Sequence, residues 1–209
     1  MATFLDIEGW NRKEHFHFFK AMDVPYFGLV ANLDCSLARE YCKDHGIPFF
    51  IYYLHKCLLA CNQLDNFKYR IEGDKVRIES KISVSPTIGR DDHTFGFSFI
   101  EYDADFSVFL SRAEVEIANI RSQSGLCLRP DTGRKDVIHF SALPWVNFTH
   151  LSHAGKVGQS DGVPKISVGK INLQGERSFM PVSLHLHHAL ADGYHAGQFF
   201  ELFEHLLNT

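Results

Sequence analysis

Residues 187–195 carry the side chains of this chain that are best suited to acid–base chemistry. They include three histidines and one aspartate, and they follow an alternating apolar and polar stretch over 178–188. Histidine suits proton abstraction because its unperturbed pKa of about 6.5 lies near working pH. Alternation places the imidazole of His188 on the apolar side of a strand end. The pattern predicts a general base at His188, and an ordinary core histidine is the alternative interpretation.

Asp192 stands where this strand is expected to give way to a helix. An aspartate just before a glycine and an apolar helix is typical of an N-cap. A carboxylate at this position can also anchor the loop through a cationic side chain. Spacing alone leaves both interpretations open.

Two other motifs would support different chemistry. Residues 158–162 match G-x-S-x-G, the nucleophile elbow of serine hydrolases, which needs a strand before the serine and a helix after it. Here a polar, glycine-bearing loop precedes the motif and a strand follows it, so we expect a chance match in a flexible loop. The clustered histidines could bind a metal, but no Asp or Cys completes a zinc-type spacing, and no metal is expected. These histidines are His185, His187, His188 and His195.

The elements that must position these side chains alternate between helix and strand. Helical spacing of apolar residues is predicted over 11–20, 48–63, 106–120 and the segment after Gly193. Strands are predicted over 26–34, 67–71, 75–80, 94–101, 137–149, 165–173 and 178–188, with a hairpin turn at 72–74. The segment 150–163 is expected to be a loop. Because no boundary is visible, we expect one α/β domain over 1–209.

Composition excludes several classes of function. The chain has 209 residues, of which 45% are hydrophobic and 22% charged, as in a globular protein. A net charge of -4 gives no reason to expect nucleic acid or an anionic membrane as partner. No signal-peptide pattern is visible, and the longest apolar run, 47–54, is too short to span a bilayer. The five unpatterned cysteines indicate reduced thiols, so a cytoplasmic location is expected.

Residues 187–195 resemble the H-H-A-x-x-D-G-[FY]-H signature of the chloramphenicol acetyltransferases of the trimeric type A, within the CoA-dependent acyltransferase superfamily. The H-x-x-x-D-G core is also shared with the acyltransferase domains of 2-oxo-acid dehydrogenase complexes. Three further segments, 10–16, 140–148 and 180–181, resemble the same family in the same order. The resemblance covers the length of the chain. It implies a single-domain, two-layer α/β sandwich with a mixed, largely antiparallel sheet.

The resemblance also implies a set of catalytic roles. His188 would deprotonate the primary hydroxyl of chloramphenicol, which then attacks the thioester carbonyl of acetyl-CoA directly. Ser141 would stabilise the oxyanion, a role whose removal typically costs ~2.7–4 kcal/mol. Asp192 and Arg12 would form an ion pair that holds the catalytic loop. Taken alone, Ser141 is also compatible with a satisfied strand hydroxyl, and Arg12 with a solvated charge.

Further positions follow from the same resemblance. Those expected near coenzyme A or the transition-state water network are Trp145, Ser167 and Lys170. Those expected near the acceptor pocket are Phe18, Phe19, His139 and His153. An aromatic slot suits a nitrophenyl ring, because ring stacking adds ~0.5–1.5 kcal/mol beyond buried area. Without the resemblance, core packing would explain the two phenylalanines. The family also implies a homotrimer whose sites lie between subunits.

The chain departs from the family at several positions. A Phe-Asn-Leu-Asn-Val stretch that helps line the family's acceptor pocket is replaced by 151–155, and Ala191 and Ile171 stand where Cys and Tyr are common. These departures leave the acceptor and the coenzyme affinity open. The alternatives are an enzyme of the same fold acting on another small hydroxylated acceptor, or a non-catalytic ligand-binding relative.

Overall fold

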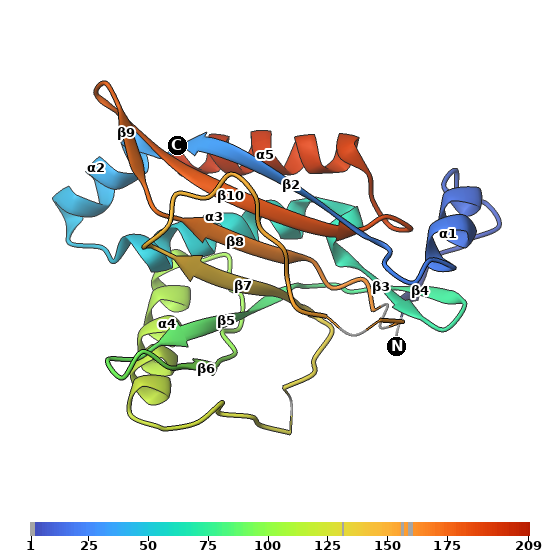
Figure 1. Ribbon diagram of the computed structural model, residues 1–209, viewed down its shortest axis with the longest axis horizontal. Helices are drawn as coiled ribbons and strands as arrows, with labels where there is room; N and C mark the ends of the chain where they lie inside the picture. Colours follow the sequence, from blue (N-terminus) through green and yellow to red (C-terminus); the bar gives the residue numbers. More distant parts are fainter. Residues whose placement is uncertain (1–2, 131, 156, 159–160) are drawn as a thin grey trace.

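The main element of the computed structural model is a mixed sheet in the strand order β2-β10-β8-β7-β5-β6, with β9 paired to one end of β10 (Figure 1). The structure describes residues 3–130, 132–155, 157–158 and 161–209. The strands are β2 (Tyr26–Asp34), β5 (Ser83–Gly89), β6 (Phe95–Phe97), β7 (Val137–Leu143), β8 (Lys165–Gly169), β9 (Asn172–Gln174) and β10 (Arg177–His187). β10 is antiparallel to β2, β8 and β9, whereas β7 is parallel to both of its neighbours. The predicted mixed, largely antiparallel sheet is confirmed.

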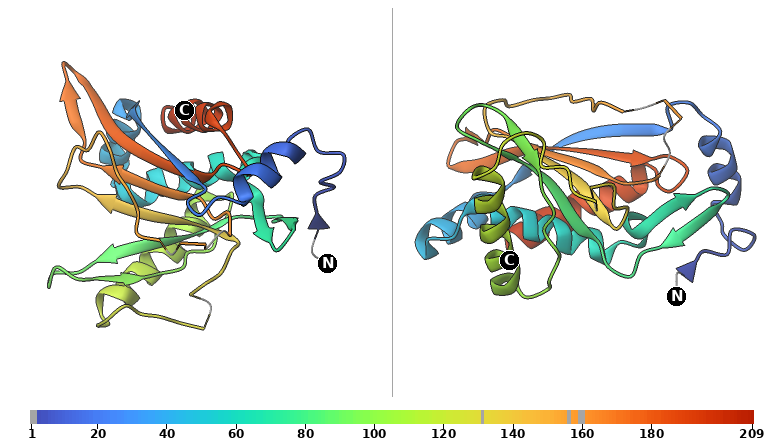
Figure 2. Two further views of the ribbon diagram at one scale, coloured as in Figure 1. Left: turned by 45° about the vertical axis from the view of Figure 1, so that its right-hand side comes forward. Right: turned by 90° about the horizontal axis from the view of Figure 1, so that it is seen from below.

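Helices cover one face of this sheet. They are α2 (Ser36–His45), α3 (Phe49–Gln63), α4 (Phe106–Arg121) and α5 (Gly193–Leu207). α3 packs on α2, α4 and α5, and the main hydrophobic core lies between these helices and the sheet. The segment 144–155 runs over the opposite face, as Figure 2 shows from below. The chain therefore folds as the predicted two-layer α/β sandwich, with a loop over its second face.

Alternation along β10 explains why the two faces differ. Leu184 and Leu186 point into the helix-covered core and are almost fully buried. Ser183 and His185 point the other way, because successive strand residues face opposite sides. We call this second side, which carries Ser141, Ser167 and Ser183 on adjacent strands, the polar face.

A smaller three-stranded sheet lies at one end of the molecule. It consists of β1 (Thr3–Phe4), β4 (Lys75–Ile78) and β3 (Tyr69–Glu72), preceded by the 3-10 helix η1 (Asp65–Lys68). The helix α1 (Lys13–Lys20) packs beside it through Phe16, Ile71 and Val76. Ala189 and Leu190, which follow β10, belong to the same hydrophobic cluster. This end of the molecule therefore supports the loop that carries His188.

Several predicted elements differ from the observed ones. The predicted strand 94–101 is shortened to β6, the strand 137–149 ends at Leu143, and the strand 165–173 is divided into β8 and β9. Neither α2 nor β5 was predicted. Residues 159 and 160 of the G-x-S-x-G match lie outside the described residues. Among the residues that are described, no helix has both the length and the apolarity to cross a bilayer.

Candidate active site

His188 directly follows β10 and is held by aromatic packing. Its imidazole stacks on Phe19, with 3.8 Å between ring centroids and 3° between planes, and it lies 4.7 Å from the ring of Phe27. Its backbone N–H donates to the carbonyl of Pro25 at 2.8 Å, and Arg12 Nη2 donates to its carbonyl at 3.2 Å. The buried Nδ1 has no hydrogen-bond partner within the described part of the chain. Ring stacking and backbone contacts therefore orient the imidazole.

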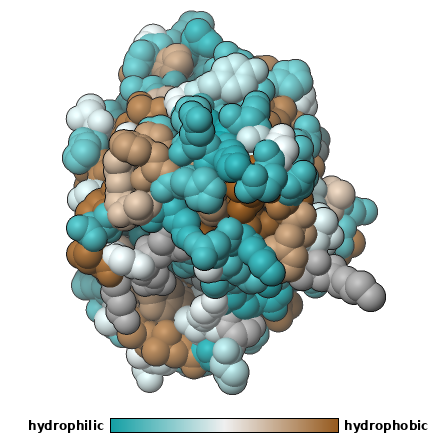
Figure 3. Space-filling model, turned by 90° about the vertical axis from the view of Figure 1, so that its right-hand side faces the viewer, coloured by the Kyte–Doolittle hydropathy of each residue, from teal (hydrophilic) through white to brown (hydrophobic). Residues whose placement is uncertain are grey.

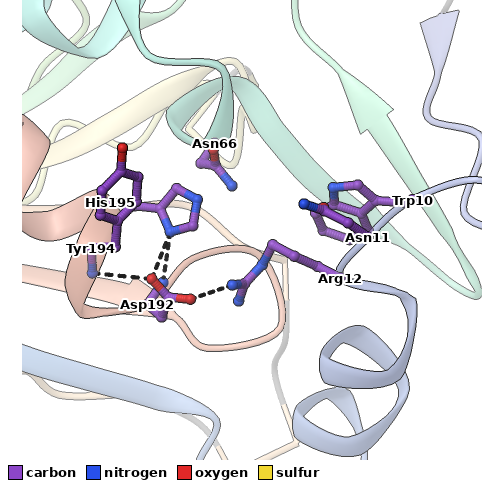
Figure 4. A pocket seen from close by; sticks show the side chains of 7 residues that line it. All are labelled: Trp10, Asn11, Arg12, Asn66, Asp192, Tyr194 and His195. Atoms are coloured by element: carbon purple, nitrogen blue, oxygen red, sulfur yellow. Dashed lines mark hydrogen bonds and ion pairs between the residues drawn. The ribbon is translucent and has the colours of Figure 1, made fainter.

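Asp192 both caps α5 and anchors the loop after β10 (Figure 4). Its Oδ1 accepts a hydrogen bond from the N–H of Tyr194 at 3.1 Å and lies 2.8 Å from Nδ1 of His195. Its Oδ2 forms an ion pair with the buried guanidinium of Arg12. Burial opposes ionisation of Asp192, but hydrogen bonds from His195 and Arg12 outweigh it and lower its pKa to about 2. The carboxylate is thus ionised at neutral pH, and the two interpretations left open by the sequence are both present.

A pocket of about 480 Å³ opens beside this ion pair (Figure 4). It is lined by Trp10, Asn11, Arg12, Asn66, Asp192, Tyr194 and His195. His188 does not line it, so this pocket lies beside the anchoring contacts of the loop and does not contain the candidate base. It is therefore distinct from the predicted acceptor pocket.

Two further contacts fix the loop after β10. Asn66 Nδ2 donates to the carbonyl of Leu190 at 2.6 Å. Gly162 adopts a φ of +80°, and a Cβ there would lie 2.5 Å from Cδ1 of Leu190. A side chain at residue 162 would therefore require Leu190 to shift.

Ser141 lies on the polar face, in a row of hydroxyls that crosses four strands. In the register of the sheet Ser141 is opposite Ser167, and Ser167 is opposite Ser183. Thr87 Oγ1 donates to Ser141 Oγ at 3.3 Å. Ser167 is completely buried, and its hydroxyl has no hydrogen-bond partner in the described structure. The row therefore offers hydroxyl donors on one face of the sheet.

A second row of polar side chains lies two positions along each strand from the row of hydroxyls. His139 is opposite Lys165, which is opposite His185 on the next strand. The ring of His153, from the overlying loop, contacts that of His185 edge-on at 4.7 Å. Sequence reasoning selected His139 and His153 but missed Lys165 and His185. The available signal was the alternation along 178–188, which places His185 on the polar face.

Desolvation and the nearby ammonium of Lys165 lower the pKa of each of these histidines. Desolvation lowers the pKa of His139 and of His185, and the ammonium of Lys165 lowers both further, although Asp161 acts against it at His139. The same causes, with the repulsion of His185 and His139 added, lower the pKa of His153 to about 4. At neutral pH each ring therefore has one N–H donor and one acceptor nitrogen.

The remaining predicted residues are spread over the surface. Trp145 is 77% exposed and Phe18 is 64% exposed. Lys170 is also exposed, and its backbone N–H donates to the carbonyl of Val146 at 2.8 Å, next to Trp145. Lys170 and Trp145 thus lie together where β7 and β8 end.

The chain brings its predicted residues together in two separate groups. One group contains Arg12, Phe19, His188 and Asp192. The other lies on or over the polar face and contains His139, Ser141, His153 and Ser167. No hydrogen bond or ring contact joins the two groups among the residues that the structure describes. Phe27, which contacts His188, is opposite Leu186 on the core side of the sheet, so the groups belong to different sides of it.

Neither a metal site nor a disulfide is seen in the described structure. Within the described ranges no three His, Cys, Asp or Glu side chains are arranged to hold a metal ion. The five cysteines are free thiols, and Cys35, Cys42, Cys57 and Cys61 are buried. The histidines of 185–195 are instead engaged in ring packing and hydrogen bonds.

The fold is that of an acyltransferase. The solved structure of a probable dihydrolipoamide acetyltransferase from Listeria monocytogenes superposes with a TM-score of 0.64, covering 93% of this chain and 88% of that chain. Its sequence is 15% identical, so the likeness shows a shared fold alone.

More specifically, the chain belongs to the chloramphenicol acetyltransferase family, whose model matches residues 1–204. The chloramphenicol acetyltransferase of Bacillus pumilus is 25% identical over 96% of this chain and 91% of that protein. A solved chloramphenicol acetyltransferase structure, 28% identical, covers 99% of this chain and 100% of its own with a TM-score of 0.90. The family predicted from the motifs is confirmed.

Proposed function

We propose that this protein transfers the acetyl group of acetyl-CoA to the primary hydroxyl of chloramphenicol or of a similar compact alcohol. The observation that carries this proposal is the fixed imidazole of His188. It is stacked on Phe19 and sits on a loop that the Arg12–Asp192 ion pair anchors. Family membership supports the same chemistry.

The proposed reaction proceeds by direct attack. Because Nδ1 of His188 is buried, Nε2 is the nitrogen available to take the proton from the acceptor hydroxyl. The acceptor oxygen then bonds to the thioester carbonyl carbon, and the hydroxyl of Ser141 donates to the resulting oxyanion. Collapse of the tetrahedral intermediate breaks the C–S bond, and the imidazolium returns its proton to the coenzyme thiolate.

The site requires two copies of the chain in this proposal. Ser141 and His188 lie on different sides of one sheet, so His188 of one subunit would face the polar face of the next, as in a cyclic homotrimer. Phe18, beside Phe19, and Val24 are 64% and 74% exposed. Figure 3 shows hydrophobic side chains among polar ones on the side of the molecule that carries α1. Exposed apolar groups next to the candidate base suit a subunit contact.

The surface near Trp145 and Lys170 suits acetyl-CoA. The side chains of Trp145 and Lys170 are both exposed on neighbouring segments, and an indole ring and an ammonium can stack on a base and pair with phosphate. The buried hydroxyl of Ser167 lacks a partner in the described structure and is available to a bound molecule or a water.

Free, buried thiols fit a reducing compartment, and we assign the enzyme to the cytoplasm.

The test is release of the coenzyme thiol from acetyl-CoA, measured with and without chloramphenicol. We expect release that depends on chloramphenicol, and a loss of at least about a hundredfold in His188→Ala, because general base catalysis contributes on that order. His205→Ala, an exposed histidine on α5, is the matched control and should keep its rate. A near-normal rate in a folded His188→Ala variant would overturn the mechanism.

A further inference from the structure

The polar face carries a basic row next to the hydroxyl row. His139, Lys165 and His185 lie on β7, β8 and β10, with Lys165 directly opposite each histidine. Directly opposite residues of neighbouring strands have their Cβ atoms about 5 Å apart, so the three side chains are adjacent. His139 is exposed, and the other two are half-buried. The row is therefore accessible and is not part of the packed core.

The ammonium of Lys165 has no carboxylate partner among the described residues. Among the residues that are described, its Nζ makes one long hydrogen bond, 3.4 Å, to the carbonyl of Ala154, and it lies 5.3 Å from the centre of the Tyr26 ring. Asp161 does act on this region, but it accepts hydrogen bonds from the hydroxyl of Tyr26 at 3.0 Å and from the N–H of Val163 at 3.1 Å. No ion pair joins it to Lys165 in the described structure. An accessible ammonium without a paired carboxylate can attract an anionic ligand.

The surrounding histidines add donors to this cation. They are uncharged at neutral pH because desolvation by the surrounding protein and the ammonium of Lys165 lower their pKa, and for His139 this holds although part of its side chain is exposed. Nε2 of His153 is buried without a hydrogen-bond partner, and its ring packs edge-on against that of His185. An anion bound here would accept hydrogen bonds from the rings and would favour their protonated form. Such a ligand would satisfy groups that the described chain leaves unpaired.

The position of the row relates it to the reacting centre. His139 and Ser141 are two residues apart on the same side of β7, which corresponds to about 7 Å. A group at that distance from the attacking hydroxyl would therefore lie over Lys165. We propose that the acceptor site recognises a carboxylate on the alcohol that is acetylated, held by Lys165 with His139 and His185. This inference rests on the proposed function, because it takes Ser141 to mark the reacting carbonyl.

The sharpest probe pair is chloramphenicol and its analogue in which a carboxylate replaces the aromatic nitro group. Nitro and carboxylate groups have the same planar shape and differ in charge. We expect a higher kcat/KM for the carboxylate compound in the wild type. Lys165→Met should remove that preference, lowering kcat/KM for the carboxylate compound by about tenfold or more, because hydrogen bonds to charged groups are strong. The fall in kcat/KM for chloramphenicol, whose nitro group carries no net charge, should be several-fold smaller than the fall for the carboxylate compound. Lys43→Met, an exposed lysine on α2, is the control.

Calorimetry of the carboxylate compound gives a second readout that needs no turnover. Binding should be accompanied by proton uptake, seen as a dependence of the heat on the ionisation enthalpy of the buffer, and Lys165→Met should weaken it. If chloramphenicol is acetylated and the carboxylate compound is neither preferred nor bound through Lys165, the inference falls and the proposed function stands. If neither compound is acetylated but the carboxylate compound binds through Lys165, the proposed function falls and the anion site stands.

Discussion

At the scale of single residues, Asp192 shows how one side chain serves two structural purposes. Its Oδ1 accepts the N–H of Tyr194 at the start of α5, and its Oδ2 pairs with Arg12, which also donates to the carbonyl of His188. A capping residue and a loop anchor were alternatives as long as only spacing was known. They are compatible because a carboxylate has two oxygens, one for the N–H of Tyr194 and one for the buried guanidinium of Arg12.

These two purposes are separable by substitution. Asn caps a helix about as well as Asp, so Asp192→Asn should keep the cap and lose the charge partner of Arg12. We expect a clear fall in kcat and a loss of stability from the unpaired guanidinium of Arg12, whereas Asp192→Ala should cost about 1 kcal/mol more in the free energy of unfolding because it also removes the cap. Urea denaturation and steady-state kinetics of both variants measure the difference. Equal activity in Asp192→Asn and the wild type would show that the ion pair is dispensable.

His187 illustrates a buried histidine that resists protonation. It is 1% exposed, and its Nδ1 accepts a hydrogen bond from the N–H of Ala189 at 3.2 Å. Burial lowers its pKa to about 4, with Asp161 opposing and His188 reinforcing the shift. An unfolded histidine titrates at about 6.5. Between these values the unfolded state binds more protons, so stability is lost as pH falls from about 6.5 to about 4 and levels off below.

We therefore expect His187→Asn to reduce the pH dependence of stability. Asn keeps an acceptor near the position of Nδ1 and does not titrate. In the wild type His187 should contribute a loss of up to ~3 kcal/mol in the free energy of unfolding between pH 6.5 and 4. Urea unfolding at three pH values in this range, compared with the exposed control His205→Asn, measures the slope. An unchanged slope in His187→Asn would mean that other groups cause the acid destabilisation.

At the scale of elements, the sequence predicted strongly periodic segments and missed weakly periodic ones. The strand over 26–34 and the helix over 48–63 agree with β2 and α3 because most of their residues contribute to one pattern. α2 was missed because it buries only Ala38 and Cys42, too few for a helical period. β5 was missed because it contains Pro86, which is normally excluded from inner strands.

The tolerance of β5 for its proline has a local cause. Around Pro86 the pairing with β6 is replaced by hydrogen bonds from the N–H and the hydroxyl of Ser98 to the carbonyl of Pro86. The regular ladder resumes at Thr87.

The basic row of the polar face was also not predicted. It is formed by three strands whose register the sequence does not show, and only His139 of its members was selected.

The loop after β10 packs against Gly162, which lies in a different segment of the chain. Gly162 has a φ of +80°, and a side chain there would meet Leu190. Gly162→Ala should lower kcat and destabilise the protein by more than the ~1–2 kcal/mol that a left-handed backbone alone costs. Gly175→Ala is the control, because Gly175 has a φ of +62° but open space around it. Equal losses in the two variants would show that contact with Leu190 is unimportant.

At the scale of the whole molecule, the two-sided sheet separates the parts of the proposed site. The helix-covered side leads to His188, and the polar face carries Ser141 and the basic row. Within the described residues, the two halves of the proposed site therefore do not meet. In the proposed cyclic assembly, the His188 half of each copy would face the Ser141 half of its neighbour, and every site would draw one residue from each of two chains.

This arrangement predicts complementation between two inactive variants. His188→Ala and Ser141→Ala should each have little activity alone. When they are unfolded together in equal amounts and refolded, about a quarter of the sites in a mixed cyclic trimer combine an intact His188 with an intact Ser141 of the neighbour. Activity should therefore recover to about a quarter of the wild-type value.

The control is to mix the two variants after each has been refolded separately. Without exchange of subunits, this mixture should stay as inactive as its components. Sedimentation of each variant would show that assembly itself is unaffected by the substitutions. If the co-refolded mixture gains no activity although mixed oligomers form, then His188 and Ser141 act within one chain or not in the same reaction. The shared site would then be wrong, because subunits that each keep one of the two residues can restore activity only across an interface.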